Sequence, residues 1–287
     1  MSGLFTWTHQ TLADLGTAPK KALGQNFLID PSVVDRIVAL IDPQPDDQVV
    51  EIGGGLGVLT RPLADRVARL VIFELDDTLR PHLAKTLAGT AQVHFLPDAI
   101  ADWDRAAPLL DPARPVKIAG NIPYQITGAL LERVVANQLG AGWETITLMV
   151  QREVADRMLA AAGDTERGKL SVFVEFHTLP GRRFPVSREA FYPKPNVDST
   201  VLQLRPRPVP LLETHELPVF DKLLERGFHM RRKTIWNNLR EGLTNEQAAI
   251  YRAGYEANGL DLTKRPQDWD LRSWLKAFWV ERELKTG

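Results

Sequence analysis

The sequence predicts an α/β fold, with a parallel sheet covered on both faces and a smaller all-α domain after it. Three observations support this prediction. Short apolar runs alternate with amphipathic stretches from residue 48 to residue 204, a proline-rich segment ends the pattern, and only helical periodicity follows. Apolar runs without polar alternation are typical of parallel strands buried on both faces.

The first domain is expected to alternate strands and helices after a polar N-terminal arm. The predicted strands cover 48–52, 70–75, 93–97, 116–122, 145–150, 170–179 and 199–204. The predicted helices cover 57–67, 78–87, 127–139 and 152–162. In such a sheet a ligand binds beyond the carboxyl ends of the strands.

The segment RPRPVP (205–210) is expected to separate two domains. Proline lacks the backbone N–H and restricts the residue before it, so the segment continues neither a strand nor a helix. We therefore predict one domain over 1–205 and a second over 211–287. The second should consist of helices over 220–230, 233–243, 245–255 and 271–285.

Composition limits the class of protein. Apolar content is 44%, charged content is 25% and there is no cysteine, so disulfides and thiolate metal sites are excluded. No apolar run approaches the roughly 18 residues needed to span a bilayer, and the N-terminus does not resemble a signal peptide. We expect a cytoplasmic monomer without a membrane partner.

Charge is unevenly distributed although the net charge is −1. Residues 181–240 carry 12 Lys/Arg against 6 Asp/Glu, a local charge of +6, which leaves −7 for the rest of the chain. A basic face of this kind can bind a polyanion such as RNA.

The first predicted strand runs into EIGGGLG (51–57), a glycine-rich turn. Gly53, Gly55 and Gly57 let the backbone turn tightly and approach a ligand. The dinucleotide-binding pattern G-x-G-x-x-G fails because its last position is Val58. The G-x-G-x-G form after Glu51 instead resembles the first motif of class I methyltransferases, although a purely structural turn is the alternative.

Two acidic residues follow the next predicted strands. Glu74 ends the second strand, where a carboxylate can accept both hydroxyls of a ribose, unless it is only a solvated strand end. Asp98 follows the third strand and can accept a hydrogen bond from the amine of an adenine. The alternative for Asp98 is a helix cap.

The fourth predicted strand ends in AGNIPY, which contains Asn121, Ile122, Pro123 and Tyr124. It resembles the motif that amine-directed nucleic-acid methyltransferases place beside the methyl donor. An Asn oxygen and a backbone carbonyl can accept the two hydrogens of an adenine amine, whose lone pair is otherwise delocalised into the ring. Proline would fix the turn, and the tyrosine ring would stack on the base. The product loses its proton to water, so neither a base nor a metal is required.

Taken together, these motifs are similar to the bacterial ribosomal RNA adenine dimethyltransferase family, which modifies two adjacent adenosines near the 3′ end of small-subunit RNA. The similarity extends over nearly the whole chain. Besides the motifs above, it is carried by LGQNFL (23–28), FELD (73–76), PDA (97–99), VQREVADR (150–157), GKLSV (168–172), AFYPKPNVDS (190–199) and RRKT (231–234). Departures are Ile122, where leucine is usual, and Gly54, where many members have proline.

The resemblance implies a Rossmann-like class I methyltransferase that binds S-adenosyl-L-methionine in its first domain and RNA with its helical second domain. It adds Gln25, Asn26 and Leu28 to Gly53, Gly55, Glu74, Asp98 and Asn121 as cofactor-binding residues. It also implies that Phe191 lies opposite Tyr124 across the target base, which must leave its stack to react. Without the family, Phe191 would be read as a packing residue.

The same resemblance implies a small ribosomal subunit or its precursor particle as partner, and a role in subunit biogenesis. Candidate RNA-binding residues lie in the basic region, where a solvated charged face is the alternative. They are Arg182, Arg183, Arg188, Lys194, Arg231, Arg232 and Lys233, with the last three expected to begin a helix.

Three other functions remain open at this point. One is methylation of large-subunit RNA, as in the antibiotic-resistance relatives. Another is an NAD-dependent oxidoreductase with the same glycine turn, which leaves residues 121–124 unexplained. The third is an RNA-binding assembly factor without catalysis.

Overall fold

A mixed seven-stranded sheet forms the centre of the first part of the chain in the computed structural model, which describes residues 3–90, 92–122, 127–136 and 142–286. The strand order is β4-β3-β2-β5-β6-β9-β7. The strands are β2 (Gln48–Ile52), β3 (Arg69–Phe73), β4 (Gln92–Leu96), β5 (Val116–Asn121), β6 (Trp143–Gln151), β7 (Thr178–Val186) and β9 (Ser199–Pro206).

The strand pairing confirms the α/β class and corrects one detail of it. Strands β2 to β6 pair in parallel, whereas β9 runs antiparallel to β6, so the sheet is not parallel throughout. Strand order reverses between β2 and β5, because β3 and β4 extend the sheet on one side of β2 and β5 and β6 on the other. This reversal is where a ligand is expected in an open α/β sheet.

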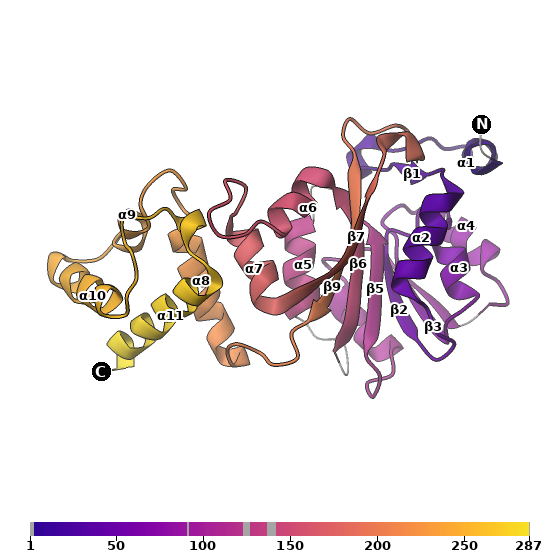
Figure 1. Ribbon diagram of the computed structural model, residues 1–287. Helices are drawn as coiled ribbons and strands as arrows, with labels where there is room; N and C mark the ends of the chain where they lie inside the picture. The colour runs from indigo at the N-terminus through magenta and orange to yellow at the C-terminus, as the bar shows by residue number, and fades with distance from the viewer. Residues whose placement is uncertain (1–2, 91, 123–126, 137–141, 287) are drawn as a thin grey trace. The chain divides into compact units, whose positions relative to one another are not determined.

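Helices cover both faces of the sheet, with α2 and α3 on one side of the strands and α5 on the other (Figure 1). The helices of this part are α1 (Gly3–Asp14), α2 (Pro31–Ile41), α3 (Thr60–Ala64), α4 (Leu79–Thr86), α5 (Thr127–Ala136) and α6 (Arg152–Met158). Helix α2 illustrates the local causes. The Asp30 side chain accepts the Ser32 N–H at its start, Pro31 occupies the first turn, and Val34, Ile37 and Ile41 are buried at helical spacing.

The N-terminal arm, which is the part of the chain before α2, contains one strand of a short antiparallel pair. Strand β1 (Phe27–Leu28) pairs with β8 (Phe191–Tyr192), and the turn of 3₁₀ helix η1 (Lys21–Leu23) precedes β1. Gly24 ends that turn with φ +64°, a conformation that favours glycine.

The segment predicted as a strand over 170–179 is helical up to His177, in α7 (Lys169–His177), and only its last two residues belong to a strand, β7. The Gly168 N–H donates to the Ser171 hydroxyl at the start of the helix. Val172 and Phe176, one helical turn apart, are buried in a cluster with Phe220 and Leu224. A short apolar run does not distinguish a strand from a buried helix by periodicity, which explains the wrong prediction.

The chain forms two compact units whose boundaries differ from the two predicted domains. The first contains residues 1–155 and 180–206, and the second contains 156–179 and 207–287. Residues 156–179, predicted to lie in the first domain, therefore group with the C-terminal helices. The change at 206–207 lies beside the predicted proline-rich boundary.

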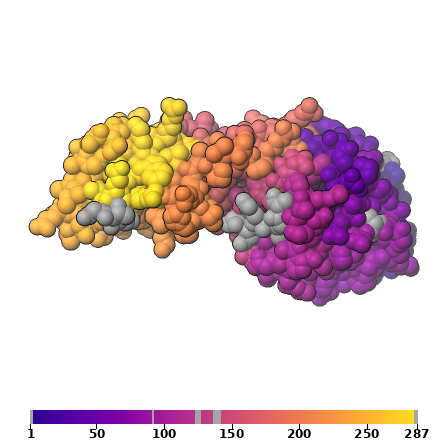
Figure 2. Space-filling view, turned by 90° about the horizontal axis from the view of Figure 1, so that it is seen from below, coloured from indigo at the N-terminus to yellow at the C-terminus, as the bar shows by residue number. Residues whose placement is uncertain are grey.

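The second unit is mainly helical among its described residues, and its strand residues are Thr178 and Leu179 at the start of β7. Besides α7 it contains α8 (Leu217–Gly227), α9 (Ile235–Leu239), α10 (Asn245–Ala257) and α11 (Leu271–Thr286). Helices α10 and α11 pack against each other, and their orange and yellow residues form a continuous surface in Figure 2. No helix among the described residues has the length and apolar character to cross a membrane.

Candidate functional site

The turn that follows β2 lies beside the carboxyl end of β5. Ile52 pairs with Gly120, and a Cβ at Gly120 would lie only 2.5 Å from the Ile52 carbonyl oxygen. Gly53 has φ +81°, and a Cβ there would lie 3.3 Å from the Asn121 carbonyl oxygen. This confirms that the glycine turn and Asn121 lie at the same edge of the sheet.

A pocket opens at this edge, between the strand ends and the N-terminal arm. Its wall contains the predicted cofactor residues Gln25, Asn26, Gly53, Gly55, Glu74, Asp98 and Asn121. Leu28 lies outside this pocket but lines an adjoining one, which shares Asn26, Phe27, Gly53, Gly55 and Asn121 with the first. The structure therefore brings the predicted cofactor residues together around two adjoining pockets.

Glu74 follows β3 and is buried, with its carboxylate in hydrogen bonds to two backbone groups. One oxygen accepts the Gly55 N–H at 2.7 Å and the other accepts the Asp76 N–H at 2.8 Å. Burial raises the pKa of Glu74 against the opposing effect of these two hydrogen bonds. Because each carboxylate oxygen has two lone pairs, Glu74 can accept two further donors from a ligand.

Asp98 lines the pocket and also caps the turn that follows it. Its Oδ1 accepts the N–H groups of Ile100 at 2.7 Å and Ala101 at 3.1 Å. The capping alternative is therefore realised in the structure, although it uses only one carboxylate oxygen. The two roles are compatible.

Asn121 is oriented by the N-terminal arm. Its Nδ2 donates to the Asn26 carbonyl at 3.1 Å. Because a carbonyl can only accept, the amide nitrogen must face the arm, and Oδ1 is the atom left to accept from a ligand. The next residue, Ile122, is buried and donates its N–H to the Met149 carbonyl at 3.1 Å. Pro123 and Tyr124 lie outside the described residues.

Phe191 has the packing position that the sequence left as the alternative. It is 3% exposed and belongs to the same core cluster as Leu28, with which it pairs between β8 and β1. In this state Phe191 is therefore a packing residue, as the alternative predicted, while Tyr124 lies outside the described residues.

Glu51 is a buried carboxylate that the sequence marked only as part of the glycine motif. It is 1% exposed, lines the adjoining pocket, and its Oε2 has no hydrogen-bond partner among the described residues. Burial raises the pKa of Glu51 to about 8, while a hydrogen bond from Thr60 lowers it and the nearby Glu74 raises it.

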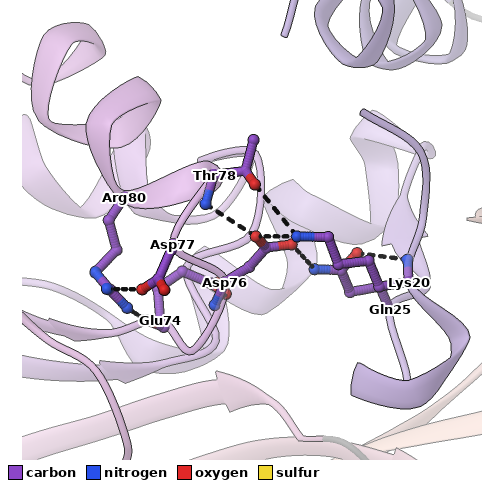
Figure 3. Close-up of polar contacts among 7 residues, drawn as sticks. All are labelled: Lys20, Gln25, Glu74, Asp76, Asp77, Thr78 and Arg80. Carbon is purple, nitrogen blue, oxygen red and sulfur yellow. Dashed lines mark hydrogen bonds and ion pairs between the residues drawn. The ribbon is translucent and has the colours of Figure 1, made fainter. Parts of the chain in front are cut away.

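The polar network around Asp76 is the part of the site that sequence reasoning missed. Asp76 lies two residues beyond Glu74 and binds Lys20 and Gln25 of the arm (Figure 3). Its only signal in the sequence is its place in FELD, two residues after the candidate Glu74.

Candidate RNA-binding residues occur in both units. Arg182, Arg183, Arg188 and Lys194 are exposed in the first unit, and Lys194 forms an ion pair with Glu189. Their exposure leaves them accessible to a polyanion.

In the second unit, Arg231, Arg232 and Lys233 form a turn before α9 rather than its first residues, because Thr234 is the N-cap. The side chain of Arg231 is already engaged, since it donates to the carbonyls of Thr165 and Arg167 at 2.6 and 2.8 Å.

Comparison with known proteins identifies the family. Residues 16–265 match the model of the family described as ribosomal RNA adenine dimethylase. The chain is 40% identical to ribosomal RNA small subunit methyltransferase A of Pelotomaculum thermopropionicum, over 78% of each chain. It is 34% identical to the protein of the same name from Listeria monocytogenes, over 94% of this chain and 92% of that protein.

Two solved structures have a similar fold. A dimethyladenosine transferase from Plasmodium falciparum aligns with a TM-score of 0.72 at 24% identity, covering 91% of this chain and 98% of that one. The 23S rRNA methyltransferase ErmE aligns with a TM-score of 0.65 at 28% identity, covering 89% and 99%. With the family match spanning most of the sequence, this chain belongs to the ribosomal RNA adenine dimethylase family and is an S-adenosylmethionine-dependent adenine methyltransferase.

Proposed function

We propose that this chain dimethylates the exocyclic amines of two adjacent adenosines near the 3′ end of small-subunit ribosomal RNA, and that Asn121 is the acceptor of the reacting amine. The observation that carries the proposal is the orientation of the Asn121 amide. The amide nitrogen faces the arm, and the backbone carbonyl of Asn121 lies directly beside Gly53 in the glycine turn of the cofactor pocket.

The pocket residues fit S-adenosylmethionine. Gly53 and Gly55 have φ of +81° and +56°, a conformation that favours glycine, and because glycine has no side chain the space beside this backbone stays open to a ligand. Glu74 retains acceptor capacity for the two ribose hydroxyls, and Asp98 has a second carboxylate oxygen for the adenine amine. When bound, the cofactor supplies an electrophilic methyl group on a sulfonium.

The acceptors around the target amine are proposed to activate it. Asn121 Oδ1 and a backbone carbonyl of the same turn would each accept one amine hydrogen, which draws the lone pair out of the ring. Holding the amine in line with the methyl group can supply up to roughly 7–11 kcal/mol of the acceleration. The proton then leaves to water, so the chain needs no dedicated base.

Two aromatic side chains, Tyr124 and Phe191, are candidates to hold the target base. Tyr124 is proposed to stack on the target adenine, a contact worth roughly 1–3 kcal/mol. Since Phe191 is buried, stacking from its side would require β8 to move away from β1. Pro123 is proposed to set the turn that points the carbonyl toward the amine.

The partner is proposed to be a small ribosomal subunit or its precursor particle, in the cytoplasm, with the chain acting as a monomer in subunit biogenesis. The names of the curated relatives support a small-subunit substrate. Arg182, Arg183, Arg188, Lys194, Arg232 and Lys233 are proposed to contact phosphates.

Methylation of isolated ribosomal particles tests the substrate. Purified protein and labelled S-adenosylmethionine are incubated separately with 30S particles and 50S particles, and modified adenosines are mapped by mass spectrometry. We expect two neighbouring dimethyladenosines in the small-subunit RNA. Modification confined to 50S particles would overturn the proposal in favour of the activity named for ErmE, and binding of NAD without S-adenosylmethionine would favour an oxidoreductase.

A further inference from the structure

The carboxylate of Asp76 is a buried junction between the sheet and the N-terminal arm (Figure 3). Its side chain is 1% exposed and lies on the loop after β3. Oδ1 accepts Lys20 Nζ at 2.6 Å and the Thr78 N–H at 3.0 Å, while Oδ2 accepts Gln25 Nε2 at 2.8 Å. A carboxylate with donors on both oxygens is held in one orientation.

Two residues of the arm, Lys20 and Gln25, are also hydrogen-bonded to each other beside Asp76. The Gln25 side chain uses both ends, since Nε2 donates to Asp76 and Oε1 accepts the Lys20 N–H at 2.8 Å. The Lys20 ammonium also donates to the Thr78 hydroxyl at 3.2 Å. Although burial acts to raise the pKa of Asp76, the hydrogen bonds from Lys20, Gln25 and Thr78 together lower it, so the carboxylate stays ionised at neutral pH.

The residue after Gln25 connects the arm to the opposite wall of the pocket. The Asn26 carbonyl accepts the Asn121 side chain at 3.1 Å, and the ring of Phe27 lies 3.5 Å from the point where a Cβ of Gly55 would be. The arm therefore crosses from the loop after β3 to the end of β5. Asp76 binds Lys20 and Gln25 of the arm on one side, and Asn121 donates to the Asn26 carbonyl on the other.

We propose that Asp76 is a positioning residue for methyl transfer, because it fastens the arm across the cofactor pocket and thereby fixes both the pocket wall at Gln25 and the carbonyl that orients Asn121. This inference rests on the proposed function. It assigns a role to a carboxylate that is not itself part of the pocket lining, and it predicts that loss of the fastening weakens cofactor binding and turnover together.

The test compares Asp76→Asn with Asp77→Asn in the full-length protein. Both remove one negative charge, but the Asp77 side chain is 85% exposed and pairs only with Arg80 among the contacts of the described residues. S-adenosylmethionine affinity is measured by calorimetry, and kcat and KM are measured on 30S particles. We expect Asp76→Asn to weaken cofactor affinity about ten-fold or more, the size expected for one charge-assisted hydrogen bond, and to lower kcat. Asp77→Asn should stay within about two-fold of wild type, because an exposed pair contributes little.

Lys20→Met, alone and combined with Asp76→Asn, separates positioning from a general loss of fold. If both act through one junction, Lys20→Met should cost several-fold alone and add little in the Asp76→Asn background. Hydrogen exchange should show faster exchange in residues 17–28, with unchanged exchange in β2, β3 and β5.

Each result decides for or against the role of Asp76. Equal behaviour of Asp76→Asn and Asp77→Asn, additive effects of Lys20→Met, or uniform acceleration of exchange across the sheet would overturn it. A wild-type protein that neither binds S-adenosylmethionine nor methylates particles would instead remove the proposed function.

Discussion

The cofactor edge of the sheet and the helical C-terminal unit each contain a buried glutamate, but the two carboxyl groups differ in their hydrogen-bond partners. Glu51 at the sheet edge is 1% exposed and leaves Oε2 without a hydrogen-bond partner among the described residues. Glu281 on α11 is 2% exposed and accepts Arg226 Nη2 at 2.6 Å and the Tyr255 hydroxyl at 2.7 Å. Buried carboxyl groups usually have hydrogen-bond partners on both oxygens. Glu281 follows this rule, whereas Glu51 has a hydrogen bond from Thr60 but none at Oε2 among the described residues.

The backbone shows the same contrast. The turn after β2 places three glycines at positive φ within five residues, at 53, 55 and 57, beside a pocket. In the helical unit, Thr234 and Thr244 cap α9 and α10 by accepting backbone N–H groups. Unused acceptors and glycine conformations at the sheet edge are features that a ligand can exploit, whereas the helical unit uses its polar groups to stabilise itself.

The largest effect is expected from Asn121→Ala, which removes the acceptor at the sheet edge. Transfer to 30S particles should fall by about 10²–10³-fold or more, the size seen when one preorganised polar group is lost from an active site. S-adenosylmethionine should still bind measurably in calorimetry, because the other residues of the pocket wall remain, whereas the reacting amine loses its acceptor. Unchanged turnover would show that Asn121 only closes the strand.

Glu51→Gln should change the pH dependence of stability. Because its folded pKa of about 8 lies above the ordinary 4.5, the folded protein binds the proton more tightly and loses stability as pH rises from about 4.5 to about 8. Glutamine does not ionise, so the variant should avoid this loss. Between about pH 5 and about pH 8 the free energy of unfolding of the variant should gain on wild type by more than about 1.4 kcal/mol, the equivalent of one pKa unit.

Urea unfolding at several pH values measures this difference, and Glu153→Gln, an exposed glutamate on α6, is the matched control. The control and wild type should have parallel profiles. If the profile of unfolding free energy against pH of Glu51→Gln is also parallel to that of wild type, the pKa of Glu51 is not raised in the folded protein, and its carboxylate has a stabilising partner there.

The sequence predicted the sheet edge better than the contacts across it. Gly53, Glu74, Asp98 and Asn121 were predictable because each ends or follows a strand, and the carboxyl ends of parallel strands meet at one edge. Asp76 and Lys20 are 56 residues apart and meet only because η1 brings the arm to the loop after β3, which no local pattern encodes. Residues 170–179 were misread for a related reason, since Val172 and Phe176 pack against the distant Phe220.

Tyr255→Phe tests the helical side of the comparison. The substitution removes the hydroxyl that donates to Glu281 while Arg226 remains bonded to it, so the free energy of unfolding should fall by about 1–2 kcal/mol. Tyr251→Phe, at a half-buried neighbouring ring, is the control and should have little effect. Cofactor affinity should not change in either variant, and a large loss of affinity in Tyr255→Phe would contradict a purely stabilising role.

The smallest effect is expected at the basic turn before α9. The side chain of Arg231 is bonded within the helical unit, whereas Arg232 and Lys233 are exposed. Arg231 donates to two backbone carbonyls, so Arg231→Ala should lower stability more than RNA affinity.

Arg232→Ala combined with Lys233→Ala removes two exposed charges. Binding to 30S particles should weaken several-fold, and the slope of log affinity against log salt should fall by about 0.7–0.9 for each phosphate that is no longer neutralised. An unaltered salt dependence would mean that the turn is a solvated face, and the RNA surface would then have to be sought among Arg182, Arg183, Arg188 and Lys194.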